Sequence, residues 1–188
     1  MLLHEVRQHA GNGYTMLDIN SANRMTVTLR SGAVYVHSGA IVTGNTAINA
    51  GEGAEVLSPV VVTLRPDTRI VAATSSEPYD PLFIDASQNP KLVVKQDLLV
   101  HHKPWGYEVE VPTEAKEIQL KRLHIREGQA TSLQFHHEKD EIMVDIEGGD
   151  AMHVPPLSQH RRTGPADYFE ASTHHPDDVV RLHDKYGR

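Results

Sequence analysis

The stretch IQLKRLHIREGQATSLQFHHEKDE, residues 118–141, contains the pattern that decides the fold class. Its first eight residues alternate, and in a β-strand this places Gln119, Lys121 and Leu123 on one face. An acidic residue and a glycine at 127–128 then indicate a turn, and a second strand-like run follows it. The stretch therefore predicts two β-strands joined by a turn.

The last eight residues of this stretch, QFHHEKDE at 134–141, have a spacing that suits metal ligands. Side chains at i and i+2 share a face of a strand, so Gln134 and His136 would project together while His137 projects oppositely. An exposed edge strand has the same appearance. The spacing alone leaves both a metal site and a solvated hairpin open.

Strand-like runs also fill most of the chain on either side. From residue 25 to 73, MTVTLR, AVYVHS, AIVTG and VVVTLR alternate with glycine-rich turns, which is typical of an antiparallel sandwich or barrel. Residues 74–90, TSSEPYDPLFIDASQNP, carry three prolines and predict a linker. Beyond it, KLVVKQDLLV, YEVEV and EIMVDIEGG again indicate strands. The fold class is therefore mainly β.

The C-terminal tail, HHPDDVVRLHDKYGR, has a different pattern. Pro176 suits the first turn of a helix, and Asp177 and Asp178 suit the positive end of a helix dipole. Lys185 and Gly187 suit the other end. These signals predict one short C-terminal helix.

The composition excludes several classes of function. The 188 residues include 18 Lys and Arg against 25 Asp and Glu, a net charge of −7, which argues against nucleic-acid and acidic-membrane partners. The chain has no cysteine, which excludes disulfides, thiol catalysis and zinc-thiolate sites. The start lacks a signal-peptide core and no apolar run reaches 18 residues, so we expect a cytoplasmic protein without a membrane partner.

A set of four residues could form the site that the histidine-rich composition indicates. Gln134, His136, Glu141 and His160 offer two imidazoles, a carboxylate and an amide oxygen. This donor set suits divalent zinc, manganese, iron or cobalt better than calcium. With 13 histidines in the chain, such a pattern also arises easily by chance.

The whole segment 103–188 resembles the cupin domain of the type II mannose-6-phosphate isomerase family. The resemblance rests on KPWGYE at 103–108, on the stretch 118–141, on HR at 160–161 and on the ending DDVVRLHDKYGR. It implies a cupin-type β-barrel, or jelly roll, and a metal-dependent aldose–ketose isomerase that acts on a sugar phosphate through an enediol.

Carried over position by position, the resemblance implies that Gln134, His136, Glu141 and His160 bind one divalent metal inside the barrel. It also implies that Lys121 points into the barrel and binds a phosphate or an enediolate oxygen. Arg161, next to a ligand, would clamp a phosphate, although a surface ion pair is an equal alternative for it.

The chain departs from this family at two places. Lys139 stands where the family usually has Arg, and only the ten residues DAMHVPPLSQ separate Gly149 from His160. That segment is short for the two strands and turn normally found there. His153 therefore competes with His160 for the role of fourth ligand.

We predict a bicupin with a degenerate, metal-free first barrel. The three segments are a β-rich cupin-like domain at 1–78, a linker at 79–97 and a metal-binding cupin domain at 98–188. We expect a homodimer that binds a small sugar or sugar phosphate. Two alternatives remain: a non-haem metal oxygenase, because two histidines and one carboxylate also bind iron, and a non-catalytic sugar-binding cupin.

Overall fold

The computed structural model describes residues 4–75, 92–114 and 117–188, and these residues form an all-β protein without a helix. The strands of the first half are β1 (His4–Ala10), β2 (Tyr14–Ser21), β3 (Met25–Leu29), β4 (Gly32–Ser38), β5 (Ala40–Thr43), β6 (Thr46–Asn49), β7 (Gly53–Val56), β8 (Val60–Leu64) and β9 (Thr68–Ser75). Those of the second half are β10 (Leu92–Lys95), β11 (Leu99–Lys103), β12 (Gly106–Glu110), β13 (Ile118–Ile125), β14 (Leu133–Phe135), β15 (Glu141–Asp145), β16 (Ala151–Val154), β17 (Ala166–Thr173) and β18 (Val180–His183).

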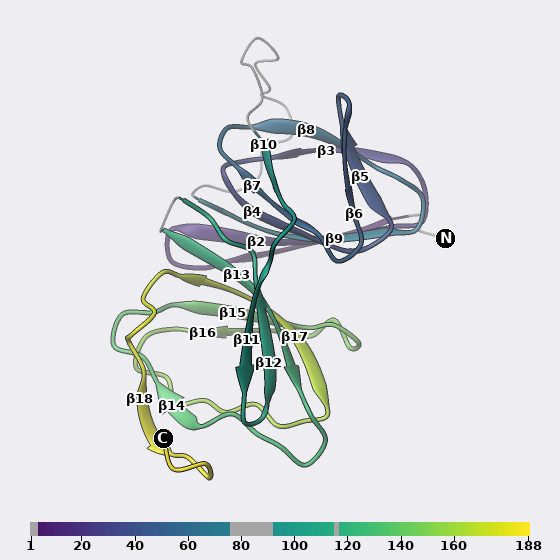
Figure 1. The fold of residues 1–188 in the computed structure, drawn as a ribbon. Helices are drawn as coiled ribbons and strands as arrows, with labels where there is room; N and C mark the ends of the chain where they lie inside the picture. The colour runs from purple at the N-terminus through teal and green to yellow at the C-terminus, as the bar shows by residue number, and fades with distance from the viewer. Residues whose placement is uncertain (1–3, 76–91, 115–116) are drawn as a thin grey trace.

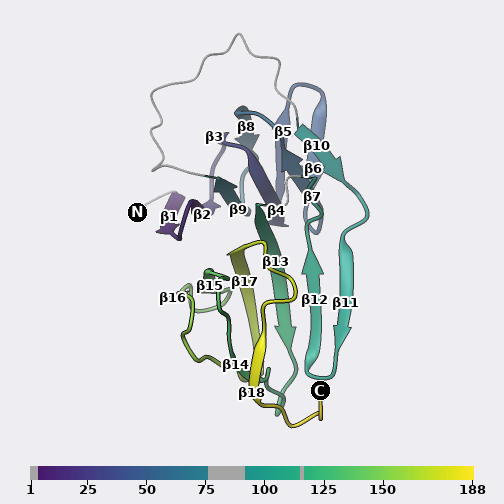
Figure 2. The ribbon, with the colours of Figure 1, turned by 90° about the vertical axis from the view of Figure 1, so that its left-hand side faces the viewer.

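The strands form four antiparallel sheets, which we name A to D (Figure 1). Sheet A has the order β1-β2-β9-β4-β7-β10, and sheet B has the order β3-β8-β5-β6. Sheet C has the order β11-β12-β13-β17-β15-β16, and sheet D pairs β14 with β18. Figure 2 shows the first half, with sheets A and B, above the second half, with sheets C and D.

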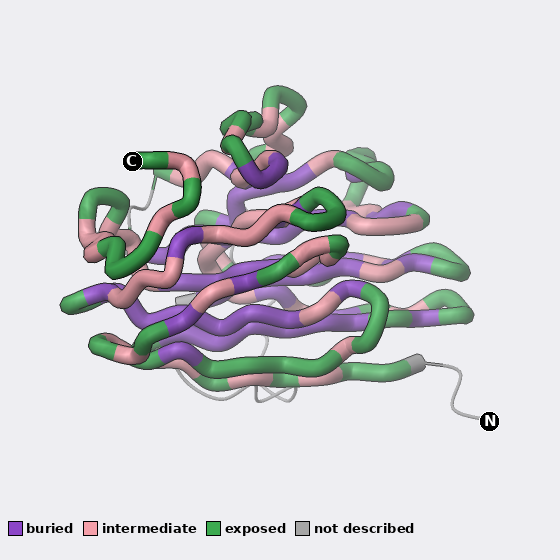
Figure 3. Tube along the Cα trace, turned by 90° about the horizontal axis from the view of Figure 1, so that it is seen from below, coloured by how far each residue is buried: buried purple, intermediate pink, exposed green. Residues whose placement is uncertain are grey.

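The central strands of sheet A, β2, β9 and β4, are buried on both faces. Along β4, Val34 and Val36 join the core that sheet A shares with sheet B, whereas Ala33 and Tyr35 join a second core against sheet C. A strand that is covered on both faces reads as a continuous apolar run, which explains the sequence AVYV. Figure 3 shows that, in the described part of the chain, the buried segments lie along the central strands, whereas the turns and the edge strands are mostly exposed or half-buried.

The second core joins the two halves of the chain. From sheet C it contains Leu120, Ile142 and Phe169, each almost fully buried. The two halves also approach closely at Gly53, where an added Cβ would lie 2.9 Å from a methyl carbon of Val111. A side chain at this position would require the side chain of Val111 to shift.

The predicted C-terminal helix is wrong. Residues 180–183 instead form β18, which pairs with β14 in the register Gln134↔Arg181 and Phe135↔Val180. A helix of two or three turns is marginal by itself, whereas pairing with β14 satisfies the backbone groups of both strands. Asp178 does not begin a helix; its carboxylate accepts hydrogen bonds from the loop that contains residues 137–139.

The C-terminal part of the predicted linker (residues 79–97) contains a strand. Residues 79–91 lie outside the described residues, but Leu92–Lys95 form β10 and pair with β7. The first half of the chain is therefore completed by a strand that follows the proline-rich segment. In the described part of the chain, no helix is long and apolar enough to cross a membrane.

Candidate metal centre

A polar cavity of about 150 Å³ lies in the second half, between sheets C and D. Side chains from β13, β14, β15 and β17 line it together with residues of the segments 136–139 and 176–181. Trp105 and Leu123 form an apolar part of its wall. The cavity therefore occupies the interior of a small barrel, where inward-facing side chains converge.

Three of the four predicted ligands meet in this cavity with metal-like geometry. Nε2 of His136 lies 3.5 Å from Oε1 of Glu141, and Nε2 of His160 lies 3.2 Å from Oε2 of the same carboxylate. One ligand atom from each residue lies within 4.8 Å of the other two. Two atoms that each lie about 2.1 Å from one metal ion are roughly 3.0–3.4 Å apart, so the three residues can hold a divalent metal.

The two imidazoles are oriented by backbone carbonyls. Nδ1–H of His136 donates to the carbonyl oxygen of Asp178, and Nδ1–H of His160 donates to that of Ser158 at 3.1 Å. These bonds fix the tautomer in which each Nε2 carries a free lone pair, the arrangement that metal-binding histidines have in proteins.

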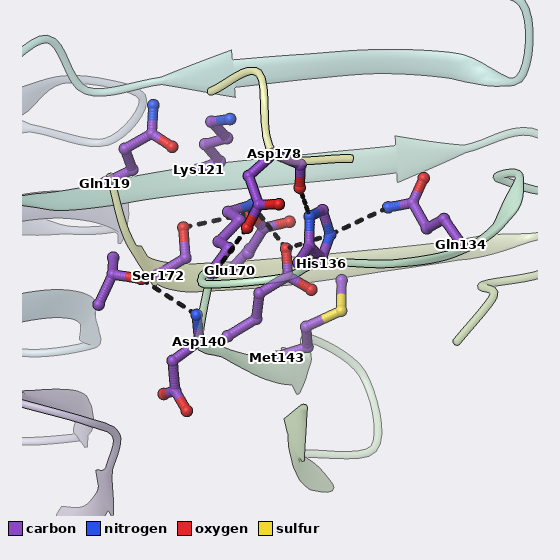
Figure 4. Close-up of polar contacts among 12 residues, drawn as sticks. Gln119, Lys121, Gln134, His136, Asp140, Met143, Glu170, Ser172 and Asp178 are labelled. Carbon is purple, nitrogen blue, oxygen red and sulfur yellow. Dashed lines mark hydrogen bonds and ion pairs between the residues drawn. The ribbon is translucent and has the colours of Figure 1, made fainter. Parts of the chain in front are cut away.

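The fourth predicted ligand, Gln134, faces the same point from β14. Its Nε2 lies 3.4 Å from Nε2 of His136 and 3.4 Å from Nε2 of His160. Figure 4 shows the amide pointing toward His136. Its Oε1 accepts a hydrogen bond from the hydroxyl of Ser132 at 2.6 Å. If the amide is flipped, its oxygen faces the histidines as a fourth ligand and its N–H donates to the hydroxyl of Ser132, which can either donate or accept.

Asp178 holds the loop that carries His136, a role that the sequence did not indicate. Its carboxylate accepts hydrogen bonds from the backbone N–H groups of residues 137, 138 and 139, at 2.8, 2.6 and 2.9 Å. Desolvation would raise the pKa of Asp178, but these three bonds outweigh it and lower the pKa to about 2. The carboxylate is therefore ionised at neutral pH and fixes the loop next to the ligand.

A buried lysine neutralises the carboxylates around the site. Nζ of Lys139 lies 2.5 Å from Oε1 of Glu141 and 2.8 Å from Oε1 of Glu170. Burial would lower the pKa of Lys139, but the two carboxylates outweigh it and raise the pKa. Burial likewise opposes ionisation of Glu170, yet the charges of Lys139 and Lys121 hold its pKa below the usual value. Lys139 and Glu170 are therefore both charged at neutral pH.

The short segment before His160 does not prevent this histidine from reaching the site. After β16, a turn around Leu157, whose N–H donates to the carbonyl of His136 at 2.7 Å, leads the chain back to the cavity. His153, the competing ligand, lies elsewhere: its Nε2 is 2.8 Å from Oδ2 of Asp140. Asp140 is itself buried.

The structure brings Lys121 to the cavity but not Arg161. Lys121 lines the cavity, the side of β13 that the resemblance implied for it, and it lies on the strand behind the site in Figure 4. Arg161 is not among the described residues that line this cavity, and its guanidinium bonds to His183. In an extended segment, neighbours of an inward-facing residue face outward, so His160 and Arg162 face the cavity while Arg161 does not.

Positive side chains outnumber negative ones around the cavity. Among the described residues that line it, six are Lys or Arg and three are Glu: Lys103, Lys121, Lys139, Arg162, Arg181, Arg188, Glu108, Glu141 and Glu170. The excess contrasts with the net charge of −7 for the whole chain. Such a cavity favours a small anion.

Comparison with known proteins shows the fold. No family model matches the chain, and no curated protein matches its sequence. Among solved structures, the formate complex of oxalate decarboxylase from Lactobacillus farciminis covers 97% of this chain with a TM-score of 0.62 and 11% identity, over 89% of its own length. A single-residue mutant of Bacillus subtilis oxalate decarboxylase covers 95%, with a TM-score of 0.61 and 10% identity, over 78% of its length.

A third solved structure, GK1651 from Geobacillus kaustophilus, covers 96% of the chain with a TM-score of 0.62 and 8% identity, over 93% of its own length. At these identities the likeness concerns the fold alone. The chain thus has a cupin-type fold, as predicted. The comparisons do not show a resemblance to mannose-6-phosphate isomerases.

Proposed function

We propose that this chain is a metal-dependent enzyme that interconverts the aldose and ketose forms of a small sugar phosphate. One observation supports it most: His136, Glu141 and His160 converge inside a cavity whose wall carries an excess of cationic side chains. A metal ion and an anion-binding wall are the two elements that such a reaction needs. The resemblance of residues 103–188 to a sugar-phosphate isomerase family supports the choice of substrate.

In this proposal Gln134, His136, Glu141 and His160 hold the metal. When bound, a divalent metal supplies Lewis-acid polarisation of a sugar carbonyl or hydroxyl. Lys121 binds the phosphate or the enediolate oxygen, since it lines the same cavity and its nearest carboxylate, Glu110, is 4.0 Å away.

The proton between C1 and C2 must be moved by a base, and two carboxylates that are not ligands line the cavity. Glu170 is a poor base at neutral pH, because Lys139 holds its pKa low. Glu108, whose charged partner Lys103 is 3.4 Å away, is therefore the residue that we assign to proton transfer.

A test of this function combines metal analysis with proton exchange. Metal-loaded protein is incubated in D₂O with a panel of hexose and pentose phosphates, and NMR measures deuterium incorporation at C1 and C2. We expect incorporation into at least one sugar phosphate, its loss in His136→Ala together with the metal, and its loss in Glu108→Gln with the metal retained. Metal-loaded protein that exchanges no proton in any of these sugars would exclude the isomerase.

A second function is favoured by the fold and by the ligand set. Two of the compared structures are oxalate decarboxylases, one of them a formate complex, and two histidines with one carboxylate also suit redox-active iron. A metal-dependent decarboxylase or oxygenase acting on a small carboxylate would use the same cavity. Release of carbon dioxide from oxalate, or substrate-dependent oxygen consumption, would identify it. Tight binding of sugar phosphates without turnover would indicate the non-catalytic alternative.

A further inference from the structure

Arg162 is a buried cation that has no carboxylate partner among the residues that the structure describes. The residue is 8% exposed, and the hydrogen bonds that its guanidinium donates go to sulfur and carbonyl acceptors. Lysine and arginine side chains are seldom buried in this way unless they are paired. The protein must therefore stabilise this charge by other means, or leave it for a ligand.

Two of the three hydrogen bonds that the guanidinium of Arg162 donates go to weak acceptors. Nε donates to the sulfur of Met143 at 3.2 Å, and Nη2 donates to the sulfur of Met152 at 2.9 Å. Nη1 donates to one backbone carbonyl, that of Arg161, at 3.1 Å, and the guanidinium carbon lies 5.8 Å from the centre of the Tyr168 ring. Thioether sulfur accepts hydrogen bonds only weakly, so the guanidinium keeps donor capacity for a stronger acceptor.

The position of Arg162 connects it to the metal centre. It lies two residues after the proposed ligand His160. Its backbone carbonyl accepts a hydrogen bond from the N–H of Thr131, in the segment before β14, at 2.9 Å. Its contact Met143 lies two residues after the ligand Glu141 on β15, on the same face of that strand. Arg162 and Met143 both line the cavity that contains the candidate ligands.

The same two residues also line a second cavity of about 270 Å³, which includes Asp145, Asp150 and Tyr168. Arg162 therefore lies in the wall between the two cavities. Among the described residues that line the second cavity, two are carboxylates, Asp145 and Asp150, and two are arginines, Arg161 and Arg162, so its charges balance, whereas the first cavity has an excess of cations. Charge therefore favours the first cavity as the place where an anion meets Arg162.

We propose that Arg162 binds the anionic group of the substrate, a phosphate or a carboxylate, beside the metal centre and so determines the substrate class. The fork of a guanidinium matches two oxygens of either group, and binding replaces sulfur contacts with charge-assisted bonds. This inference rests on the proposed function only for the identity of the whole substrate. A phosphate would indicate a sugar phosphate, and a carboxylate would indicate a small organic acid.

The test uses two probes, inorganic phosphate and oxalate, on protein loaded with Mn²⁺ or with Zn²⁺. Calorimetry measures affinity, and the ³¹P or ¹³C linewidth of the probe reports proximity to Mn²⁺. We expect Arg162→Gln to weaken binding of the preferred probe about 10- to 100-fold and to change metal affinity less than about twofold. Arg161→Gln removes the same charge from the neighbouring position that faces away, and it should bind both probes like the unaltered chain.

Arg162→Lys guards against a variant that fails to fold, because it keeps the charge and loses the fork; it should weaken binding by an intermediate factor. Unchanged binding of both probes in Arg162→Gln would overturn the proposal. The proposal would also be overturned if binding of a probe depended on Arg162 but Mn²⁺ did not broaden the NMR signal of that probe, because the anion would then lie in the second cavity. If the unaltered chain binds no metal, the proposed function fails, while calorimetry with the metal-free protein still tests Arg162.

Discussion

The space between sheets A and B and the space between sheets C and D differ in what fills them. The first is filled mainly by apolar side chains, among them Leu29, Ile41 and Leu64. The second contains a small apolar cluster around Trp105 and Ile125, and beside it a buried set of histidines, carboxylates and a lysine. Buried charges cost folding free energy unless they are paired, whereas buried methyl groups contribute to it. The first half therefore contributes mainly stability, and the second holds a site.

The largest effect is expected when one imidazole is removed from the second half. His136→Ala should weaken metal binding by more than about 100-fold, because loss of even an outer partner of a ligand costs 10- to 100-fold. The fold should survive, since a chain of this length buries enough apolar surface without a metal. Titration with Zn²⁺ or Mn²⁺ and far-UV circular dichroism measure the two effects. His153→Ala, which changes a histidine outside the site, should keep the metal; loss in both variants would contradict the assignment.

The converse test removes apolar volume from the first half. Leu64→Ala should lower the free energy of unfolding by about 2–5 kcal/mol, because Leu64 is fully buried between sheets A and B. Metal stoichiometry of the folded protein should not change. Urea unfolding measures the loss, and Val61→Ala on the exposed side of the same strand should change stability by less than about 0.5 kcal/mol. Equal effects of the two variants would mean that this core is not closely packed.

A third test concerns the support of the site rather than its ligands. Asp178→Ala removes the acceptor of three backbone N–H groups next to His136, and it should weaken metal binding about 10- to 100-fold. Asp177→Ala changes the neighbouring carboxylate, which is exposed, and serves as the matched control. Metal titration of both variants decides the point: if they bind metal equally, the loop keeps its shape without Asp178.

The smallest effect is expected at the C-terminal segment. The hydroxyl of Tyr186 donates to Oε1 of Gln129 at 2.9 Å or to the carbonyl of Ala130 at 3.1 Å, and so ties the segment after β18 to the one before β14. Tyr186→Phe should lower the free energy of unfolding by about 0.5–1.5 kcal/mol in urea. The ring remains packed, so a larger loss would show that the segment also carries other contacts.

The fold class and most of the site could be predicted from local patterns. Alternation along β13 placed Gln119, Lys121 and Leu123 on one face, and the resemblance assigned Lys121 to the barrel interior. The spacing of Gln134 and His136 placed both on one face of the next strand. The donor types of Gln134, His136, Glu141 and His160 selected these four as a set, and the resemblance assigned them to one metal. Which side chains share a face could be predicted because strand alternation is a local property of the backbone. Because residues i and i+2 share a face, alternation from His160 would have selected Arg162 in place of Arg161 as the residue that faces the cavity.

The remaining features depend on contacts between distant parts of the sequence. Asp178 lies about 40 residues from the loop that it holds, and its neighbours Pro176 and Asp177 suit a helix start equally well in isolation. The partners of Lys139 come from two strands, and the pairing of His153 with Asp140 leaves His160 as the candidate ligand. No local spacing encodes these pairings, because they arise only when the sheets pack.

Because the central strands of sheet A pack against sheet C, the second half of the chain would not be fully covered by itself. The face of sheet C that lies opposite the metal centre is apolar, with Leu120, Val144 and Phe169 almost completely shielded, and strands β4 and β9 are part of the shield. A fragment beginning at residue 98 would carry every candidate ligand and would still display this face to water, so it should self-associate. The half without predicted ligands thus covers the apolar face of the other half and keeps it from water.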